Sequence, residues 1–219
     1  MNATQHPRKP FNAKGSKVKR CHDCLLAEEY CICAQRKPTV ADVEIWLLMH
    51  KEEAYKPTNT GKLIEDTLPD HCRRFYWHRT DPDPEFIKCL GDDRYIPHII
   101  YPDDRGGYDD RLVYEPISKA GKRAAFIILD GSWRQAGRMF RLSQYLQDIP
   151  VLPIKNQRIS NYKLRKAPDE FHLCTAEVAM AVLDMSGETT AVENLQYLFD
   201  RFNQSYADAR RNIKPGGCV

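Results

Sequence analysis

Residues 123–133 read Arg-Ala-Ala-Phe-Ile-Ile-Leu-Asp-Gly-Ser-Trp. The apolar run after the arginine is typical of a short strand that is buried on both faces of a sheet. Gly131 permits a tight turn directly after this run, and Ser132 is a residue type that caps helix N-termini. The sequence therefore predicts a central strand over 123–130, followed at once by a helix over 132–146.

Short apolar segments alternate with helical patterns along the rest of the chain. The predicted strands cover residues 43–49, 74–77, 97–101 and 150–154, and the predicted helices cover residues 60–68, 84–89, 175–183 and 190–211. This alternation is typical of an α/β fold with a mostly parallel sheet and flanking helices. The prolines in the 150–154 segment predict an edge strand, and the turn-rich segment 101–108 predicts a surface loop.

The composition fits one principal domain with a small appendage. The chain has 219 residues, of which 42% are hydrophobic and 29% are charged, so it has enough apolar material for a sizeable core. No apolar run is long enough to span a membrane. The first residues also lack the apolar core of a secretory signal, so we expect a cytoplasmic protein.

The N-terminal residues are strongly basic. Residues 1–20 carry six cations and no acidic residue. Such a segment can neutralise the phosphates of a nucleic acid without a fold of its own, although an ordinary solvated terminus has the same composition. We expect a flexible basic arm over 1–20, a compact knuckle over 21–38 and the main domain over 39–219.

Four of the eight cysteines lie close together, at Cys21, Cys24, Cys31 and Cys33. The spacing Cys-x2-Cys-x6-Cys-x-Cys brings four soft ligands within reach of one tetrahedral ion, and thiolate sets of this kind favour zinc. An iron–sulfur cluster and four unligated thiols are the alternatives. Because four thiolates leave no open position on the metal, we expect a structural zinc site.

Asp130 directly follows the predicted central strand. In open α/β sheets, ligands bind at the carboxyl ends of the strands. Trp133 can line an adenine-sized pocket, or it can simply pack under its own helix. An acidic residue before a glycine at a strand end is common, so a binding role and a structural role, such as capping the helix that starts at Ser132, both remain open.

Two further segments and one helix face carry polar or basic groups. The helix that follows Ser132 has Arg134, Arg138 and Arg141 in one stripe, which suits the capture of phosphate or carboxylate but is also ordinary for a solvated face. The loop 56–61, Lys-Pro-Thr-Asn-Thr-Gly, can hold a polar ligand or cap the next helix.

The second of these segments is the basic stretch 160–168, which can contact RNA or a cofactor carboxylate. The single histidines His50, His78 and His98 are of a kind that is more often structural than ligating, and no role is assigned to them.

Taken together, these segments resemble the DTW-domain family of tRNA-uridine aminocarboxypropyltransferases. The residues that carry the resemblance are the four cysteines of the knuckle, Lys56–Gly61, Asp130–Trp133, Tyr162–Pro168 and Leu173–Val178. They fall in one order over most of the chain. The family signature is Asp-x-Thr-Trp, and this chain has Ser132 in place of the threonine, which keeps the hydroxyl group.

The resemblance implies a fold related to the SPOUT methyltransferases, with a cofactor cleft near a threaded C-terminal segment. It implies that the 3-amino-3-carboxypropyl group of S-adenosylmethionine moves to N3 of a uridine in tRNA, in bacteria typically in the variable loop, with release of 5′-methylthioadenosine. The expected partners are therefore tRNA and S-adenosylmethionine, with zinc as a structural metal and no membrane. The oligomeric state remains open.

The chemistry of this transfer leads us to expect a general base, because uridine N3 is only weakly acidic; Asp130 is the first candidate and Glu177 is the second. The expected cofactor-binding residues are Leu129, Asp130, Gly131, Ser132, Trp133, Leu164, Arg165 and Thr175. The expected RNA-binding residues are Lys56, Thr58, Asn59, Arg134, Arg138, Tyr162 and Lys166.

Two other functions remain open at this point. A SPOUT-like RNA methyltransferase would use the same donor but would transfer its methyl group. A zinc-knuckle protein that only binds RNA would catalyse no reaction. The mass added to tRNA separates the first alternative from the proposed transfer, and the absence of methylthioadenosine identifies the second.

Overall fold

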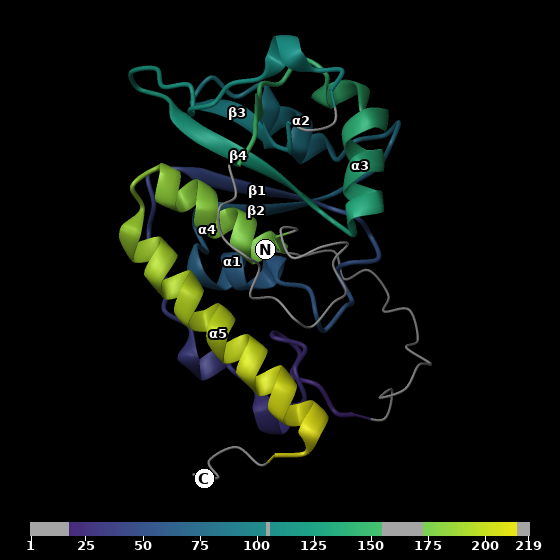
Figure 1. Cartoon of the computed structure of the whole chain (residues 1–219), viewed down its shortest axis with the longest axis vertical. Coiled ribbons are helices and arrows are strands. Elements are labelled where there is room, and N and C mark those ends of the chain that lie inside the picture. Colours follow the sequence, from purple (N-terminus) through teal and green to yellow (C-terminus); the bar gives the residue numbers. More distant parts are fainter. Residues whose placement is uncertain (1–17, 104–105, 155–172, 214–219) are drawn as a thin grey trace.

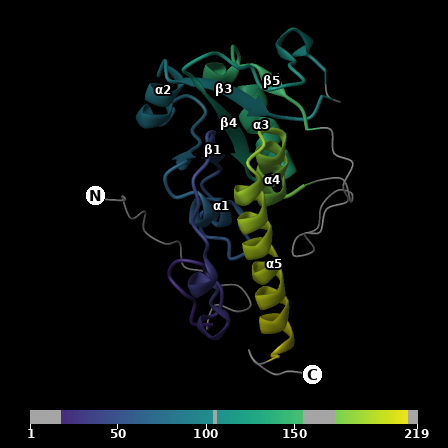
Figure 2. The same ribbon diagram turned by 90° about the vertical axis from the view of Figure 1, so that its left-hand side faces the viewer.

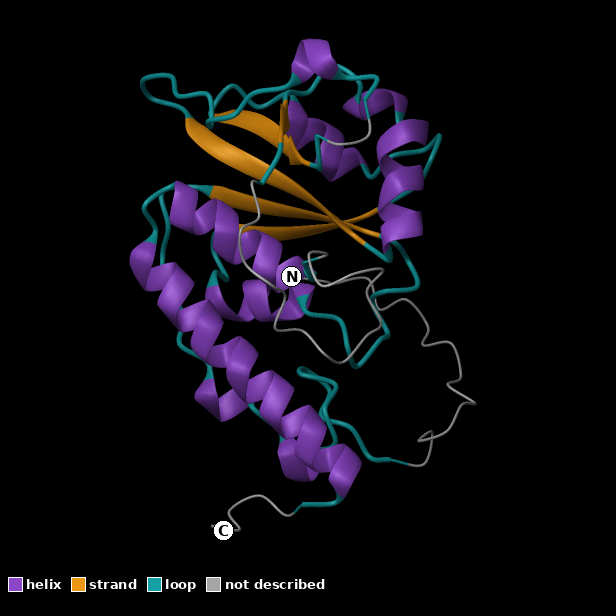
Figure 3. Ribbon diagram, viewed as in Figure 1, coloured by secondary structure: helices purple, strands orange, loops and turns teal. Residues whose placement is uncertain are grey.

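The computed structural model describes residues 18–103, 106–154 and 173–213. Its centre is one five-stranded sheet with the order β2-β1-β4-β3-β5, and every neighbouring pair is parallel. The strands are β1 (Glu44–Met49), β2 (Cys72–Tyr76), β3 (Tyr95–Ile100), β4 (Arg123–Asp130) and β5 (Val151–Leu152). The expected α/β class is confirmed, and the described part of the sheet is parallel throughout (Figure 3).

The central position of β4 explains why its sequence is so apolar. It pairs with β1 on one side and β3 on the other, so neither edge of the strand is free. Helices cover both faces of the sheet, and the residues from Ala125 to Asp130 are all buried. A strand in this position has no solvent face, and it therefore lacks the alternation of polar and apolar residues found in half-exposed strands.

Helices form a layer on each face of the sheet (Figure 1). One layer holds α1 (Gly61–Thr67), α4 (Thr175–Met185) and α5 (Thr189–Arg211), and the other holds α2 (Pro84–Leu90) and α3 (Trp133–Leu142). Figure 2 shows that α5 continues beyond the sheet alongside the N-terminal segment. There Arg201 donates a hydrogen bond from Nε to Oε1 of Gln35 at 2.7 Å.

The helix after β4 is shorter than the sequence predicts. It ends at Leu142 instead of residue 146, and a separate 3-10 turn covers Gln144–Leu146. Between them, Ser143 is extended and buried, and its hydroxyl accepts a hydrogen bond from the Trp77 indole N–H at 2.8 Å. Trp77 directly follows β2, so this hydrogen bond joins the end of another strand to the residue where α3 stops. Helical periodicity in the sequence does not reveal such a contact.

The expected surface loop over 101–108 is wrong at both ends. Tyr101 and Tyr108 are buried. The ring of Tyr101 stacks on Phe140 of α3 with 4.0 Å between centroids, and Tyr108 meets the same ring edge-on at 5.0 Å. The two aromatic ends anchor the segment to the core, because burial of their rings outweighs the turn-forming composition between them.

The edge strand is confirmed, since β5 (Val151 and Leu152) is the last strand in the sheet order and its named partner is β3, with one isolated bridge from Val151 to Leu112 besides. The parallel arrangement also brings the carboxyl ends of three strands together. Met49 of β1 lies opposite Asp130 of β4 and Tyr76 of β2. Polar groups that follow these residues therefore meet at one edge of the sheet.

Among the described helices, none is both long and apolar enough to cross a lipid bilayer.

His98 is a buried polar residue in β3. Its Nδ1 lies 3.0 Å from the carbonyl oxygen of Ile96, and its Nε2 accepts the backbone N–H of Ile117 at 2.9 Å. The neutral ring with its proton on Nδ1 satisfies both contacts, whereas a protonated ring would direct an N–H at the Ile117 N–H. Burial accordingly lowers the pKa of His98 below its ordinary value of 6.5.

This environment predicts an acid-sensitive fold. Below pH 6.5 the unfolded chain binds a proton at His98 that the folded chain resists, so the free energy of unfolding falls as the pH drops from 6.5 towards the lower folded pKa. One proton corresponds to a slope of at most about 1.4 kcal/mol per pH unit. We expect His98→Gln to reduce the slope measured by urea unfolding between about pH 5 and 7. The exposed His78→Gln should retain it, and equal slopes in both variants would contradict the assignment.

Candidate functional site

The carboxylate of Asp130 is the centre of the site at the sheet edge. It is only 1% exposed. Its Oδ1 accepts a hydrogen bond from the Thr175 hydroxyl at 2.7 Å, and its Oδ2 accepts one from Nδ2 of Asn59 at 2.8 Å. Three segments that are distant in the sequence, 56–61, 130–133 and 173–178, therefore meet at one carboxylate.

The loop before α1 is fixed by further polar contacts. Oδ1 of Asn59 accepts the backbone N–H of Lys62 at 3.3 Å, so both ends of this amide are engaged. The hydroxyl of Thr60 accepts the backbone N–H of Ala176 at 3.2 Å and thus joins the loop to α4. Gly61 lies so close to Asp130 that a Cβ atom on it would be 2.8 Å from Oδ2.

Glu177, the second candidate base, is buried in the first turn of α4. Its Oε2 accepts the backbone N–H of Cys174 at 2.8 Å, which satisfies one of the N–H groups at the helix start. This contact gives Glu177 a structural task. Its role as a base stays a prediction.

Ser132, in the turn after β4, caps the N-terminus of α3. The Ser132 hydroxyl accepts the backbone N–H of Gln135, and the Gln135 side chain in turn accepts the backbone N–H of Ser132 at 2.8 Å. The N-cap residue of α3 is therefore Ser132 and not Asp130. Leu129 is buried and Trp133 half-buried, so Trp133 keeps part of its surface exposed beside the turn.

A second cluster at the same edge was missed by the sequence analysis. His50 directly follows β1, and its backbone N–H donates to the carbonyl oxygen of Asp130 at 2.8 Å. Its ring stacks on Trp77, which follows β2, with 5.9 Å between centroids. Burial lowers the pKa of His50, although the carboxylates of Glu52 and Glu53 act in the other direction. The position of His50 directly after a predicted strand was the signal available in the sequence.

The predicted RNA-binding residues fall into different environments. Arg134 and Arg138 are exposed on α3, as the stripe predicted. Lys56 forms an ion pair with the fully buried Glu53, with 2.5 Å between Nζ and Oε1. Thr58 is half-buried, and Asn59 is only 3% exposed because it faces Asp130. The predicted residues Tyr162, Leu164, Arg165 and Lys166 lie outside the described residues.

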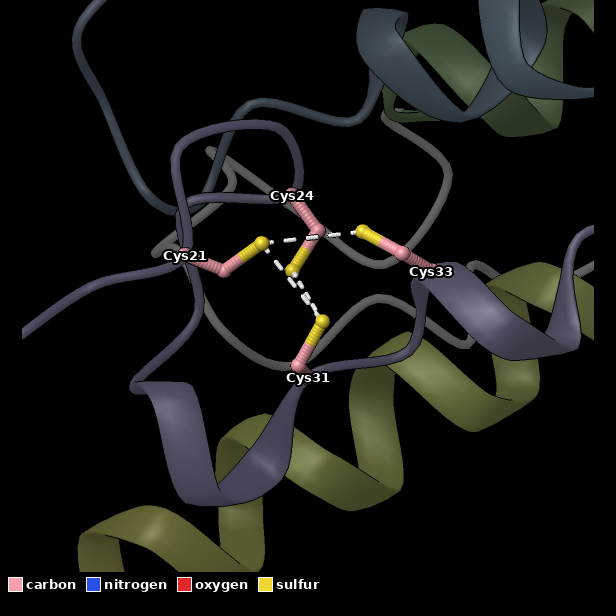
Figure 4. A group of neighbouring side chains, drawn as sticks. All are labelled: Cys21, Cys24, Cys31 and Cys33. Carbon is pink, nitrogen blue, oxygen red and sulfur yellow. Dashed lines mark hydrogen bonds between the residues drawn. The ribbon is translucent and has the colours of Figure 1, made fainter.

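The four cysteines of the knuckle come together as the spacing predicted (Figure 4). Their sulfur atoms all lie within 4.8 Å of one another. The separations are 3.5 Å between Cys21 and Cys31, 3.6 Å between Cys21 and Cys33, and 3.8 Å between Cys24 and Cys31. The cluster can therefore present four sulfur ligands to one metal ion.

The thiols of this cluster differ in acidity. Burial alone would raise the pKa of Cys21, but hydrogen bonds from the backbone of Cys24 and Asp23 and from the neighbouring thiols lower it to about 7. Burial raises the pKa of Cys24 and Cys33, and the neighbouring sulfur atoms raise it further. Of these three thiols, Cys21 therefore loses its proton most readily.

Lys62 links the knuckle to the site loop. This buried side chain of α1 donates to the carbonyl oxygen of Cys24 and lies 3.4 Å from that of Pro57. Its ammonium group also lies 5.1 Å from the centre of the Phe202 ring of α5. Burial lowers the pKa of Lys62 to about 8. One side chain therefore connects the four-cysteine cluster, the loop that carries Asn59, and the long C-terminal helix.

The close approach of Gly61 to Asp130 gives a specific prediction. Gly61→Ala places a methyl group 2.8 Å from Oδ2 of Asp130 and 3.2 Å from Oδ1 of Asn59, so the loop or the carboxylate must move. We expect a loss of about 1–3 kcal/mol in the free energy of unfolding. The matched control is Gly91→Ala, where the nearest atom would be 3.7 Å away. Equal stability of the two variants would contradict the tight packing.

Comparison with known proteins adds a family to this geometry. The chain is 25% identical to tRNA-uridine aminocarboxypropyltransferase 2 of Macaca fascicularis, over 81% of this chain and 61% of the relative. It is 25% identical to the protein of the same name in Drosophila melanogaster, over 77% and 68%. The Mus musculus protein of that name is 22% identical, over 79% and 58%.

The chain thus spans less than two thirds of the length of the macaque and mouse relatives. No solved structure matches it. The model of the DTW domain matches residues 18–207, which include the four-cysteine cluster, the loop of Asn59, the turn after β4 and the start of α4. By this match over most of its length, the chain belongs to the DTW domain family.

Proposed function

We propose that this protein is a tRNA-uridine aminocarboxypropyltransferase. It moves the 3-amino-3-carboxypropyl group of S-adenosylmethionine to N3 of a uridine, in the variable loop of a tRNA. Membership of the DTW domain family and the names of the relatives support this reaction. The observation that carries it is the buried Asp130 carboxylate at the strand ends, where Asn59 and Thr175 converge on it.

The transfer is a displacement at carbon. N3 of the uridine forms a bond to the γ-carbon of the aminocarboxypropyl group as the bond from that carbon to sulfur breaks. The electron pair of the broken bond stays on sulfur, which becomes the neutral thioether of 5′-methylthioadenosine, and the N3 proton passes to solvent. Because the sulfonium activates three carbon atoms, the main task of the protein is to orient the donor relative to the uracil of the acceptor.

The groups around the sheet edge suit this donor. Leu129, Gly131 and Ser132 form the turn beside the carboxylate, and Trp133 offers a half-buried ring for an adenine. The hydroxyl of Thr175 and the backbone of the turn offer polar contacts for the amino-acid end of the donor. On the family resemblance, Leu164 and Arg165 are also proposed to belong to the donor site.

The burial of Asp130 changes its proposed role. A carboxylate that is 1% exposed and accepts hydrogen bonds at both oxygens is poorly placed to take a proton from a bound base. We propose that Asp130 is a positioning residue, which holds Asn59 and Thr175 in place. Asn59 joins it in that task, whereas Lys56, Thr58, Arg134, Arg138, Tyr162 and Lys166 remain proposed RNA contacts.

The function is tested by incubating the full-length protein with S-adenosylmethionine and uridine-containing tRNA. Mass analysis of the digested tRNA should reveal 3-(3-amino-3-carboxypropyl)uridine, together with one methylthioadenosine for each modified base. A methylated nucleoside with S-adenosylhomocysteine would instead establish the RNA methyltransferase. Binding of tRNA without either product would leave only an RNA-binding role.

Exchange of two side chains tests whether Asp130 acts by position. In Asp130→Asn, the new amide oxygen can accept the Asn59 N–H only if the new amide N–H faces the Thr175 hydroxyl, which must then accept instead of donate. The variant also removes the negative charge that both partners hydrogen-bond. We expect about a 100-fold loss of transfer rate. The double variant Asn59→Asp with Asp130→Asn can form every one of these hydrogen bonds again, so it should regain at least about tenfold. A double variant as inactive as Asp130→Asn would return the role of base to Asp130.

We also propose that the four-cysteine cluster holds a structural zinc ion. With zinc–sulfur bonds of about 2.3 Å, a regular tetrahedron has sulfur atoms about 3.8 Å apart. The observed separations of 3.5, 3.6 and 3.8 Å fit this geometry. Cys21, Cys24, Cys31 and Cys33 would hold the ion, and its contribution would be to fold the knuckle against α1 and α5.

Replacement of two ligands tests the metal. Cys21→Ser with Cys24→Ser should remove about one equivalent of zinc per chain, measured by atomic emission of the purified protein, and should lower the melting temperature. Cys72→Ser is the matched control, because this buried cysteine lies on β2 outside the cluster. Unchanged metal content in the double variant, or iron in place of zinc, would contradict the zinc assignment.

A further inference from the structure

We propose that His50 is a further catalytic residue of the proposed transferase. Its Nε2–H group donates a hydrogen bond to a carbonyl oxygen of the acceptor uracil and stabilises the negative charge that develops there as N3 loses its proton. The inference rests on the proposed function. It follows from three observations: a hydrogen-bond network that determines the tautomer of His50, the place of the ring at the sheet edge, and its stacking on Trp77.

The network begins with the amide of Gln135, whose orientation is determined by its partners. Its Oε1 accepts both the backbone N–H and the hydroxyl of Ser132, each at 2.8 Å. Its Nε2 lies 3.0 Å from Oε2 of Glu52 and 3.0 Å from Nδ1 of His50. A backbone N–H cannot accept, so the amide oxygen must face Ser132 and the amide nitrogen must face His50.

This orientation assigns the tautomer of His50. Its Nδ1 faces the amide N–H of Gln135 and, at 3.4 Å, the backbone N–H of Glu52. Both groups are donors, so Nδ1 is an acceptor and carries no proton. The neutral ring must then hold its proton on Nε2. Gln135 is therefore a positioning residue, and it makes Nε2 of His50 a permanent hydrogen-bond donor.

The donor lies at the edge where the proposed reaction takes place. The backbone of His50 pairs with Asp130, yet the two side chains have partners in different layers. Asp130 contacts Asn59 and Thr175 on the α1 and α4 side, whereas His50 contacts Gln135 of α3 and the ring of Trp77. His50 is half-buried, and its Nε2 has no hydrogen-bond partner within the described ranges.

The acceptor base needs such a donor. Loss of the N3 proton places negative charge on the two carbonyl oxygens that flank N3, and a fixed neutral donor stabilises that charge without a proton transfer of its own. Attack of N3 on the γ-carbon then proceeds as described above, with the N3 proton released to solvent. Because Nε2 already holds a proton, His50 does not act as the base.

The tautomer is measured first, in the full-length protein without substrates. Isotope-labelled histidine gives different nitrogen chemical shifts for protonated and unprotonated ring positions, and the His50 signals are identified by their loss in His50→Phe. We expect protonated Nε2 and unprotonated Nδ1 at neutral pH. The reverse pattern would overturn the proposal whatever reaction the protein catalyses.

Substitution of the ring then tests its part in the reaction. His50→Phe keeps an aromatic ring next to Trp77 and removes the donor, and we expect kcat to fall about 100-fold to 1000-fold with little change in tRNA affinity. The matched control is His78→Phe. His78 is exposed, directly follows Trp77 in the sequence and has no assigned task. Normal kcat in His50→Phe would overturn the proposal.

Gln135→Glu provides a readout that a purely structural role would not alter. The new carboxylate accepts a hydrogen bond from Nδ1. The neutral ring therefore holds its proton on Nδ1, and Nε2 can no longer donate a hydrogen bond. The charged groups with the largest electrostatic effect on the ring are Glu52, Glu53, Lys56 and Lys51 of the same loop, and the new carboxylate would also lie beside Oε2 of Glu52, which the Gln135 amide contacts at 3.0 Å. At lower pH the ring of this variant becomes doubly protonated and regains the donor. We therefore expect its activity, relative to wild type, to rise as the pH falls, and a constant ratio would count against the network.

The outcomes separate this inference from the proposed function. If the wild-type protein forms no aminocarboxypropyl-uridine, the proposed function fails and the catalytic role of His50 fails with it. If the wild type forms the product and His50→Phe forms it equally fast, only the role of His50 is overturned. Product from wild type and its loss in His50→Phe, with the Nε2–H tautomer, supports both.

Discussion

The structure of the site depends on one buried carboxylate. Removing a charged group such as Asp130 from water costs several kcal/mol unless hydrogen bonds replace its hydration. Asn59 and Thr175 supply two of these bonds, and they come from different elements. The loop before α1 and the start of α4 are therefore held at the end of β4 by the same electrostatic requirement, and Gly61 is needed because no side chain fits beside Oδ2.

The same loop is coupled to the N-terminal knuckle. Lys62 is the second residue of α1, directly after the Asn59 loop, and its ammonium group is buried between the carbonyl oxygens of Cys24 and Pro57. Arg36 of the knuckle adds an ion pair to Asp66 of α1 at 2.9 Å. A metal bound by the four cysteines would thus stabilise the segment that carries Asn59, which gives a structural metal an indirect connection to the transfer site.

Two polar clusters flank the carboxyl edge of the sheet, one on each side. The Asp130 cluster is buried and engaged by its neighbours, whereas the His50 ring is half-buried beside Trp77. Positioning groups are typically enclosed, because precise placement requires packing, and groups that touch a substrate need an open side. The division between the clusters therefore matches the division of tasks that we propose, with Asp130 as a support and His50 towards the acceptor base.

Much of this protein follows from its sequence alone. The apolar run before Asp130 predicted β4 and the cysteine spacing predicted the cluster, because such features depend on residues that are close in the chain. The segments around Asn59 and Thr175 were singled out by the family resemblance, but their meeting at Asp130 was not predicted. The strand order, the burial of Asp130 and the contacts of His50 were decided by the tertiary structure. His50, Trp77 and Gln135 are neighbours only because β1 and β2 are adjacent and α3 begins where β4 ends, and interactions across that distance leave no periodicity or spacing in the sequence.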